Sequence, residues 1–296
     1  MLNWKKNVMA LALTSLAATP LVAQDTANDT TTAENATAET QAREQANPAI
    51  EEAVAALTET GNALKALEDN KNDEAAAALE RAIGKLEVVL TQYPELAFAP
   101  VDVSSTVIDI AASPAVIAKA RKEALRLMKD DQLQLARPII NNLASEVVVR
   151  TTSIPLVTYP LTLKSAAALI KDDKVDDAKA VLAQGLNTMV VEEVVSPLPL
   201  LRASALIEQA KALSEKENRS DEENQKLATL LDALDVQIAK GEALQYGGKD
   251  AFAPLKVEMR QIRKATGDGG FGSGFFDKLS GLFDGLGKSH NEATGN

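Results

Sequence analysis

The chain has 296 residues, a net charge of −11 and an isoelectric point of about 4.8. So acidic a surface repels nucleic acid, and we expect no nucleic-acid partner. The absence of cysteine excludes disulfides and thiolate chemistry, although a chain of this length can bury enough apolar surface to fold without them.

Residues 1–23 have the pattern of an export signal. Lys5 and Lys6 precede an apolar stretch from Val8 to Ala18, and a cleavage after Ala23 would suit a small-residue rule. The apolar stretch is too short for a permanent membrane span. The sequence therefore predicts a secreted protein; the alternative is a buried N-terminal helix.

Two composition changes divide the rest of the chain. Residues 24–47 are rich in Thr, Ala, Asn and Glu, and we expect a disordered linker there because little apolar surface is available for burial. Residues 48–265 are rich in Ala, Leu and Val and read as one helical domain. Residues 266–296 form a tail that is rich in Gly and Phe.

The helical domain shows the 3.6-residue period of amphipathic helices. Ser113 followed by Pro114 predicts a helix start, and Ser220 followed by Glu223 has the spacing of a capping box. The apolar stripes are Ile50, Val54, Leu57, Leu64 and Leu67; then Leu79, Ile83, Leu86 and Leu90; then Ala178, Val181, Leu182, Gly185, Leu186 and Met189; and then Leu227, Leu230, Leu231, Leu234 and Ile238.

Three segments of the domain align as an internal repeat, with Ala75, Ala136 and Ala178 as equivalent positions. Each unit is predicted to be the end of one helix, a polar turn, a second helix of about five turns, and a proline stop. The aligned residues are Leu67, Met128 and Ile170 eight positions earlier, Leu79, Ile140 and Leu182 four positions later, and Pro94, Pro155 and Pro197 nineteen positions later.

Two pieces between the units, "FAPVDVSSTVI" and "VVVRTTSIPLVTYP", favour short strands or extended loops. The predicted fold is therefore mainly α, with helical hairpins packed as a bundle and short β-like or extended connecting segments.

The stretch "LIKDDKVDDA" carries four aspartates in the polar turn of the third unit. Asp172 and Asp173 align with Asp130–Asp131 and with Asp69–Asn70, where a left-handed backbone and capping of the next helix are expected. Asp176 and Asp177 fall in the first turn of that helix, where negative charge is favourable. The alternative is a cation site, and with it a metal-assisted hydrolase, but the calcium-loop pattern is missing.

Other catalytic patterns are missing from the sequence. The single histidine, His290, lies in the tail, and the glycines of "DGGFGSGF" follow no strand and precede no phosphate-binding lysine. We expect no enzymatic activity, no metal and no cofactor.

The segment "FFDKLSGLFDGLGK" in the tail predicts a short amphipathic helix. We expect its apolar face to dock on the domain itself or on a neighbouring subunit, and any contact with a membrane to run through this tail alone. The face comprises Phe275, Phe276, Leu279, Leu282, Phe283 and Leu286.

Residues 50–265 resemble the YfdX family of Gram-negative proteins, most specifically in "PLVTYP" and "SPLPLL". The resemblance implies a periplasmic, mainly helical, homo-oligomeric protein that is associated with acid and other envelope stress and has no established enzymatic activity. We expect protein clients as partners. The candidate interface residues are Pro155, Tyr159, Pro160, Pro197, Pro199, Phe275, Phe276 and Phe283.

A second resemblance is to the tetratricopeptide repeat, carried by "DNKNDEAAAALERAIGKLEVVLTQYPELA". It implies an adaptor that binds peptides in a helical groove. The unequal spacing of the three units departs from the regular period of that repeat. The leading hypothesis is a non-catalytic periplasmic binding protein, and the adaptor is the alternative.

Overall fold

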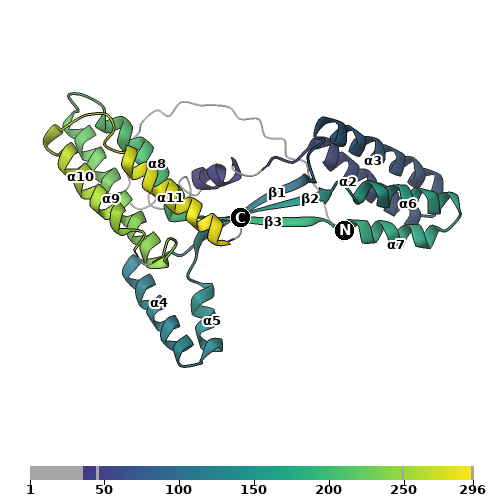
Figure 1. Cartoon of the computed structure of the whole chain (residues 1–296), viewed down its shortest axis with the longest axis horizontal. Helices are drawn as coiled ribbons and strands as arrows, with labels where there is room; N and C mark the ends of the chain where they lie inside the picture. The colour runs from purple at the N-terminus through teal and green to yellow at the C-terminus, as the bar shows by residue number, and fades with distance from the viewer. Residues whose placement is uncertain (1–35, 45–46, 249, 295–296) are drawn as a thin grey trace, which may run out of the picture.

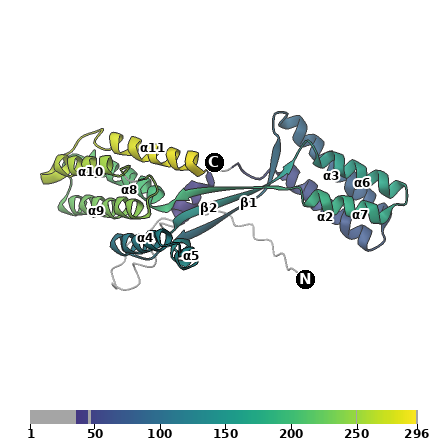
Figure 2. The same cartoon turned by 60° about the horizontal axis from the view of Figure 1, so that its bottom comes forward.

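The computed structural model describes residues 36–44, 47–248 and 250–294. Figure 1 shows an elongated molecule in which two helical lobes lie at opposite ends of a narrow three-stranded sheet. A further helical hairpin projects from the sheet end that adjoins the second lobe (Figures 1 and 2). The prediction of a mainly α fold with short strands is confirmed.

The elements of the first lobe come from two separate parts of the chain. They are α2 (Glu51–Glu68), α3 (Asn72–Gln92), α6 (Tyr159–Lys171) and α7 (Val175–Leu186). The projecting hairpin consists of α4 (Pro114–Lys129) and α5 (Leu133–Asn141). The second lobe contains α8 (Leu198–Ser214), α9 (Asp221–Leu244), α10 (Ala253–Thr266), the 3₁₀ turn η1 (Gly267–Gly269) and α11 (Asp277–Thr294).

The sheet is antiparallel throughout, with β2 (Ser145–Pro155) between β1 (Phe98–Asp109) and β3 (Val190–Pro197). Phe98 pairs with Pro155 at the end near the first lobe, and Asp109 pairs with Ser145 at the end near the second lobe. The chain therefore crosses the sheet between successive hairpins, and this places the second hairpin at the far end from the first and third.

Two helix starts follow their predicted chemistry. The Ser113 hydroxyl accepts a hydrogen bond from the Val116 amide, with Pro114 as the first helical residue of α4. Ser220 and Glu223 form the reciprocal capping box at the start of α9. Both side chains satisfy amides that the first helical turn leaves without a partner.

The core of α2 differs from its predicted leucine stripe. The deeply buried face carries small residues, while Val54 is 37% exposed and Leu57 and Leu64 are only partly buried. Small side chains let α2 approach its neighbours closely, so they lie at the centre of the packing. The buried residues of α2 are Ala53, Ala56, Thr60, Ala63, Ala66 and Leu67.

The predicted disordered linker over residues 24–47 needs correction where the structure describes it. Residues 36–44 form a helix that lies on the sheet, with Ala38 and Ala42 buried against Val147 and Val149. Arg43 also donates a hydrogen bond to the Val103 carbonyl at 3.1 Å. Two alanines are enough because they fill a shallow apolar surface that the sheet supplies.

The predicted export signal, residues 1–23, lies outside the described residues.

The predicted units are wrong about their second helices and proline stops. Only α3 is long and followed directly by its proline, Pro94. In the other units the helix stops early, and Pro155 and Pro197 end the strands β2 and β3. The missed strand β3 begins in "VVEEVV", whose β-branched residues suit a sheet edge.

The tail helix α11 packs on its own chain. Phe276, Leu279, Phe283 and Leu286 are buried in the core of the second lobe, and Phe275 and Leu282 pack beside them. Lys211 of α8 also pairs with Asp277 at 2.7 Å. Of the two docking alternatives, this structure shows docking on the domain itself. Among the described residues no helix is both long and apolar enough to cross a membrane.

Candidate interaction surface

The three repeat units share one turn at atomic detail. Asn70, Asp131 and Asp173 each adopt a left-handed backbone with φ of +58°. The next amide in each unit bonds back to the helix, as Lys174 does to the Leu169 carbonyl at 2.9 Å, and Asp173 bonds to the Ile170 carbonyl at 3.1 Å. This is the Schellman arrangement, which satisfies the carbonyls at a helix end.

The predicted left-handed positions are therefore confirmed, while the predicted capping of the next helix by these side chains is wrong. The N-cap residues are Lys71, Gln132 and Lys174, and none of them forms a side-chain cap. Asp176 and Asp177 lie in the first turn of α7, as predicted. The backbone conformation alone accounts for the shared spacing of the acids within the three units.

The first and third hairpins pack against one another and leave out the second. Helix α3 contacts α6, and α2 contacts α7. The repeat positions Leu67, Leu79, Ile170 and Leu182 are all buried in the resulting core. Because consecutive hairpins do not stack, residues 51–186 form no solenoid, and the tetratricopeptide alternative does not fit this chain.

The second hairpin carries its apolar residues on the surface. Within the described residues, α5 packs chiefly on α4, and α4 packs on α9 through the opposite end of the hairpin. Besides Val116 near the start of α4, five large apolar side chains of the hairpin are 42–61% exposed: Leu125, Met128, Leu133, Leu135 and Ile140. We call these five the hairpin surface. Exposed apolar patches are typical of protein interaction sites, so the hairpin surface is a candidate for one.

A charged cluster joins the end of the sheet next to this hairpin to the second lobe. The Asp109 carboxylate, at the end of β1, accepts bonds from Arg202 of α8 at 2.9 Å and from Lys240 of α9 at 2.6 Å. The Ser145 hydroxyl donates a third bond at 2.6 Å, and the Ser145 amide donates to the Tyr246 hydroxyl at 2.7 Å. The cluster ties one strand end to two helices.

Burial and bonding act in opposite directions on Asp109. Partial burial opposes ionisation, but the bonds from Lys240 and Ser145 and the charge of Arg202 hold the pKa of Asp109 below its usual range. Burial raises the pKa of Tyr246. The Ser145 hydroxyl donates a hydrogen bond to the Asp109 carboxylate, but a carboxylate whose pKa is held low by two neighbouring cations is a weak general base. The cluster can hold elements together and does not resemble a catalytic arrangement.

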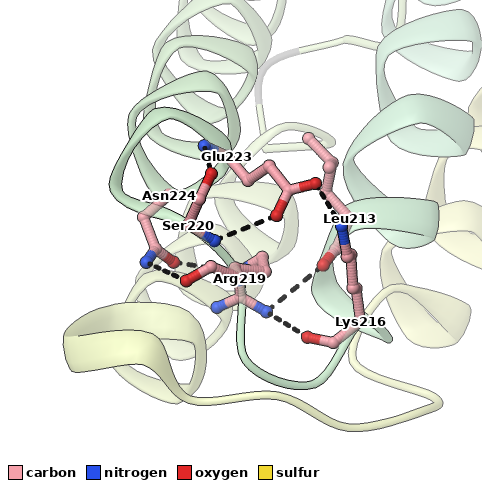
Figure 3. Close-up of polar contacts among 6 residues, drawn as sticks. All are labelled: Leu213, Lys216, Arg219, Ser220, Glu223 and Asn224. Atoms are coloured by element: carbon pink, nitrogen blue, oxygen red, sulfur yellow. Dashed lines mark hydrogen bonds and ion pairs between the residues drawn. The ribbon is translucent and has the colours of Figure 1, made fainter.

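A third buried cation, Arg219, hydrogen-bonds to groups that lie at helix ends. Its guanidinium donates to the carbonyls of Leu213 and Lys216 at the end of α8, and to the Asn224 side chain at the start of α9 (Figure 3). It also donates to the carbonyls of Thr266, at the end of α10, and of Gly270, just beyond it. One side chain thus closes three helix ends of the second lobe.

The predicted interface residues do not form one surface. Pro155, Tyr159 and Pro160 lie where β2 enters α6, with Tyr159 and Pro160 buried in the first lobe. Pro197 and Pro199 lie at the opposite sheet end and are buried where β3 enters α8. The remaining three, Phe275, Phe276 and Phe283, belong to the second lobe, and Phe276 and Phe283 are core residues of it.

These prolines lie where a strand enters a helix, and the rings of Pro160, Pro197 and Pro199 are buried in this structure, whereas Pro155 is partly exposed. The hairpin surface was missed as a site, although Met128 and Ile140 already stand in the repeat alignment. Sequence could not separate them from their buried equivalents, because all three units have apolar residues there.

Two hollows of the molecule differ in size and in the polarity of their lining. An open groove of about 990 Å³ lies between the turns of the first lobe, with polar lining that includes Lys71, Glu80 and Lys171. A smaller cavity of about 390 Å³ lies between the 36–44 helix, α8 and α9 and is mostly apolar. In the part of the chain that the structure describes, no three acidic or histidine side chains are grouped to hold a metal ion.

Comparison with known proteins gives one family. Residues 56–195 match the family model described as YfdX protein. A solved structure of Salmonella Typhi YfdX aligns with 50% of this chain and 91% of its own length, at 18% identity and a TM-score of 0.35. No curated protein matches the chain. The family match covers nearly all of the three hairpins and most of the sheet.

Proposed function

We propose, on the premise that this chain belongs to the YfdX family, that it is a non-catalytic periplasmic protein that binds protein partners and partly unfolded clients during envelope stress. The observation that carries the proposal is the hairpin surface on α4 and α5. Its leucines, methionine and isoleucine are exposed on an element that projects from the molecule. Flexible apolar side chains of this kind adapt to varied apolar segments.

Three further features support the proposal. The partly buried Asp109 and the buried Arg219 are both bonded within the fold, so neither is set up to act on a substrate. The predicted export signal over residues 1–23 favours the periplasm. The absence of cysteine suits an oxidising compartment, since no thiol is present to be oxidised.

The test is suppression of client aggregation by the purified protein, followed as light scattering of heat-denatured citrate synthase. We expect the wild type to lower the scattering in a dose-dependent manner. The double variant Leu133→Asp/Leu135→Asp should lose this effect, because two charges interrupt the apolar surface. Both positions are more than half exposed, so the variant keeps its fold.

The matched control is Val157→Asp, which adds a charge at a 74% exposed valine outside the hairpin. It should suppress aggregation as the wild type does. Equal activity of the double variant and the control would contradict the proposal, as would a wild type that leaves the scattering unchanged.

A further inference from the structure

The internal repeat specifies a partner for the hairpin surface. We propose that α4–α5 pairs with α4–α5 of a second copy of this chain about a two-fold axis, as α2–α3 pairs with α6–α7 inside the molecule. This deepens the proposed function, on which it rests, by naming one occupant of the same surface. The evidence is the burial of equivalent positions in the three repeat units.

The first and third hairpins pack together through a set of apolar positions, and the equivalent positions of the second hairpin are exposed. Eight residues before the anchor alanine, Leu67 and Ile170 are buried, while Met128 is 42% exposed. Four residues after it, Leu79 and Leu182 are buried, while Ile140 is 44% exposed. The second hairpin thus has the apolar residues of this packing face without a packing partner among the described elements.

Two neighbouring positions follow the same rule. Leu125 is equivalent to Leu64 and Ala167, and Leu133 is equivalent to Asn72 and Val175. Leu64, Ala167 and Val175 pack against the core of the first lobe, whereas Leu125 and Leu133 are 57% and 58% exposed. The pairing face of the second hairpin therefore comprises Leu125, Met128, Leu133 and Ile140.

By contrast, positions that lie inside each hairpin are buried in all three units. Ala75, Ala136 and Ala178 are fully buried, and so are Ile117 of α4 and its equivalents Ala56 and Tyr159. Each hairpin is therefore closed by its own two helices, and what distinguishes the second unit is the exposure of the positions through which another hairpin would pack.

The contacts inside the first lobe are reciprocal. The second helix of the first hairpin, α3, contacts the first helix of the third, α6, and the first helix α2 contacts the second helix α7. Exchanging the two hairpins leaves this pattern unchanged, which is the signature of a two-fold relation. Two identical α4–α5 hairpins can adopt the same relation, with α4 of each copy on α5 of the other.

The size of the face fits a weak, reversible dimer. Helix α4 has 16 residues, so the face is about 24 Å long and about 20 Å across two helices. Two such faces remove about 1,000 Å² from solvent, near the lower limit for specific interfaces. Association should therefore depend on protein concentration.

Charge gives the pairing an expected salt dependence. Residues 114–141 contain six basic and three acidic side chains, a net charge of +3, in a chain of net charge −11. Two copies of this hairpin repel one another, so added salt should strengthen the dimer. Docking of the hairpin on an acidic surface of another copy would instead weaken as salt is added.

The experiment measures the mass of the full-length protein against concentration by sedimentation equilibrium. We expect a monomer–dimer equilibrium that tightens with sodium chloride. The variant Met128→Asp/Ile140→Asp should dissociate at least about 100-fold more readily, because charges would be buried in an apolar interface. The matched control is Leu135→Asp: Leu135 is 61% exposed but equivalent to Glu74 and Asp177, which lie outside the pairing face. It should associate as the wild type does.

A second measurement, chemical cross-linking, tests the pairing without placing a charge in the interface, so it does not depend on the folding of the Asp variants. Because the chain has no cysteine, Met128→Cys introduces a single thiol, and a short bifunctional maleimide should join two copies. The same reagent should leave Leu135→Cys as a monomer. A wild type that stays monomeric at every concentration, or a dimer unaffected by Met128→Asp/Ile140→Asp, would overturn the inference.

Two outcomes separate this inference from the proposed function. Suppression of client aggregation by a protein that never dimerises would remove the self-pairing and leave client binding intact. A salt-strengthened dimer that does not bind clients would do the reverse. A dimer that salt weakens would point to docking on an acidic surface and would also overturn the two-fold pairing.

Discussion

The first and second hairpins of this protein have the same turn and different surroundings. In α2–α3 the residues around the turn are buried by α6–α7, and in α4–α5 the equivalent residues face solvent. The turn itself is unchanged, with φ of +58° at Asn70 and at Asp131. The comparison shows that local chemistry specifies the hairpin, while the partner that covers it is set by where the sheet carries it.

The largest expected difference between the two hairpins is the loss of unfolding free energy at one pair of equivalent positions, Leu79 and Ile140. Leu79→Ala should cost about 3 kcal/mol of unfolding free energy, because Leu79 is fully buried in the first lobe. Ile140→Ala should change it by less than about 0.5 kcal/mol in the monomer, because Ile140 is already half exposed. Urea unfolding of dilute protein measures both. Similar losses at the two positions would show that the second hairpin is covered within one chain.

A smaller effect tests how the second hairpin is anchored. Asp109→Asn leaves Arg202 and Lys240, which are no more than about one-tenth exposed, without their carboxylate. Allowing for the partial exposure of Asp109, we expect a loss of about 2 kcal/mol. Hydrogen exchange should rise in α4, α8 and α9 and stay unchanged in α2 and α3, which lie at the other end of the sheet.

The same variant carries a pH dependence. Because the folded-state pKa of Asp109 lies below its usual value of about 3.9, the stabilisation by this carboxylate is fully present above about pH 5. It is lost as the pH falls through the folded-state pKa. The stability difference between wild type and Asp109→Asn should therefore shrink in strong acid, and a constant difference down to about pH 2 would contradict this account.

The smallest effect concerns the shared turn, and it should be equal in the exposed second hairpin and in the third hairpin, which packs against the first. Asp131→Val and Asp173→Val should each cost about 1–2 kcal/mol, since a β-branched residue resists the left-handed backbone. Asp131→Gly and Asp173→Gly should be neutral or stabilising by up to about 1 kcal/mol. Thermal unfolding compares the four variants. A large difference between the hairpins would mean that tertiary packing, and not the turn alone, holds these residues.

Local features of the fold could be predicted from sequence, because neighbouring residues determine them. The turns at Asp131 and Asp173 and the capping box at Ser220 are examples. The strand β3 could not, since Val190–Pro197 is extended only because β2 pairs with it. The helix over residues 36–44 depends in the same way on the apolar surface of the sheet.

In the candidate site too, the sequence indicates local features but not those that depend on tertiary packing. Met128 and Ile140 could be found as apolar members of the repeat, but their exposure depends on which hairpins pack together. Nothing in the spacing of the units indicates that the first pairs with the third. Similarly, Asp109, Arg202 and Lys240 are far apart in the sequence and meet only because the sheet returns to the second lobe. The prolines of the predicted interface have a backbone role that the sequence correctly marks as special but does not identify.

The pairing of the first hairpin with the third also has a consequence for the order of folding. Helix α3 ends at Gln92, and its partner α6 begins only at Tyr159, after a whole hairpin and two strands. As the chain emerges from a ribosome or a translocation channel, the apolar face of α2–α3 therefore has no native packing partner until α6 and α7 follow. Contacts between such distant segments slow folding, and during that wait the neighbouring α4–α5 hairpin is the nearest surface with the same pattern. The native core of the first lobe can form only after α6 and α7 have been made, because it takes residues from both hairpins.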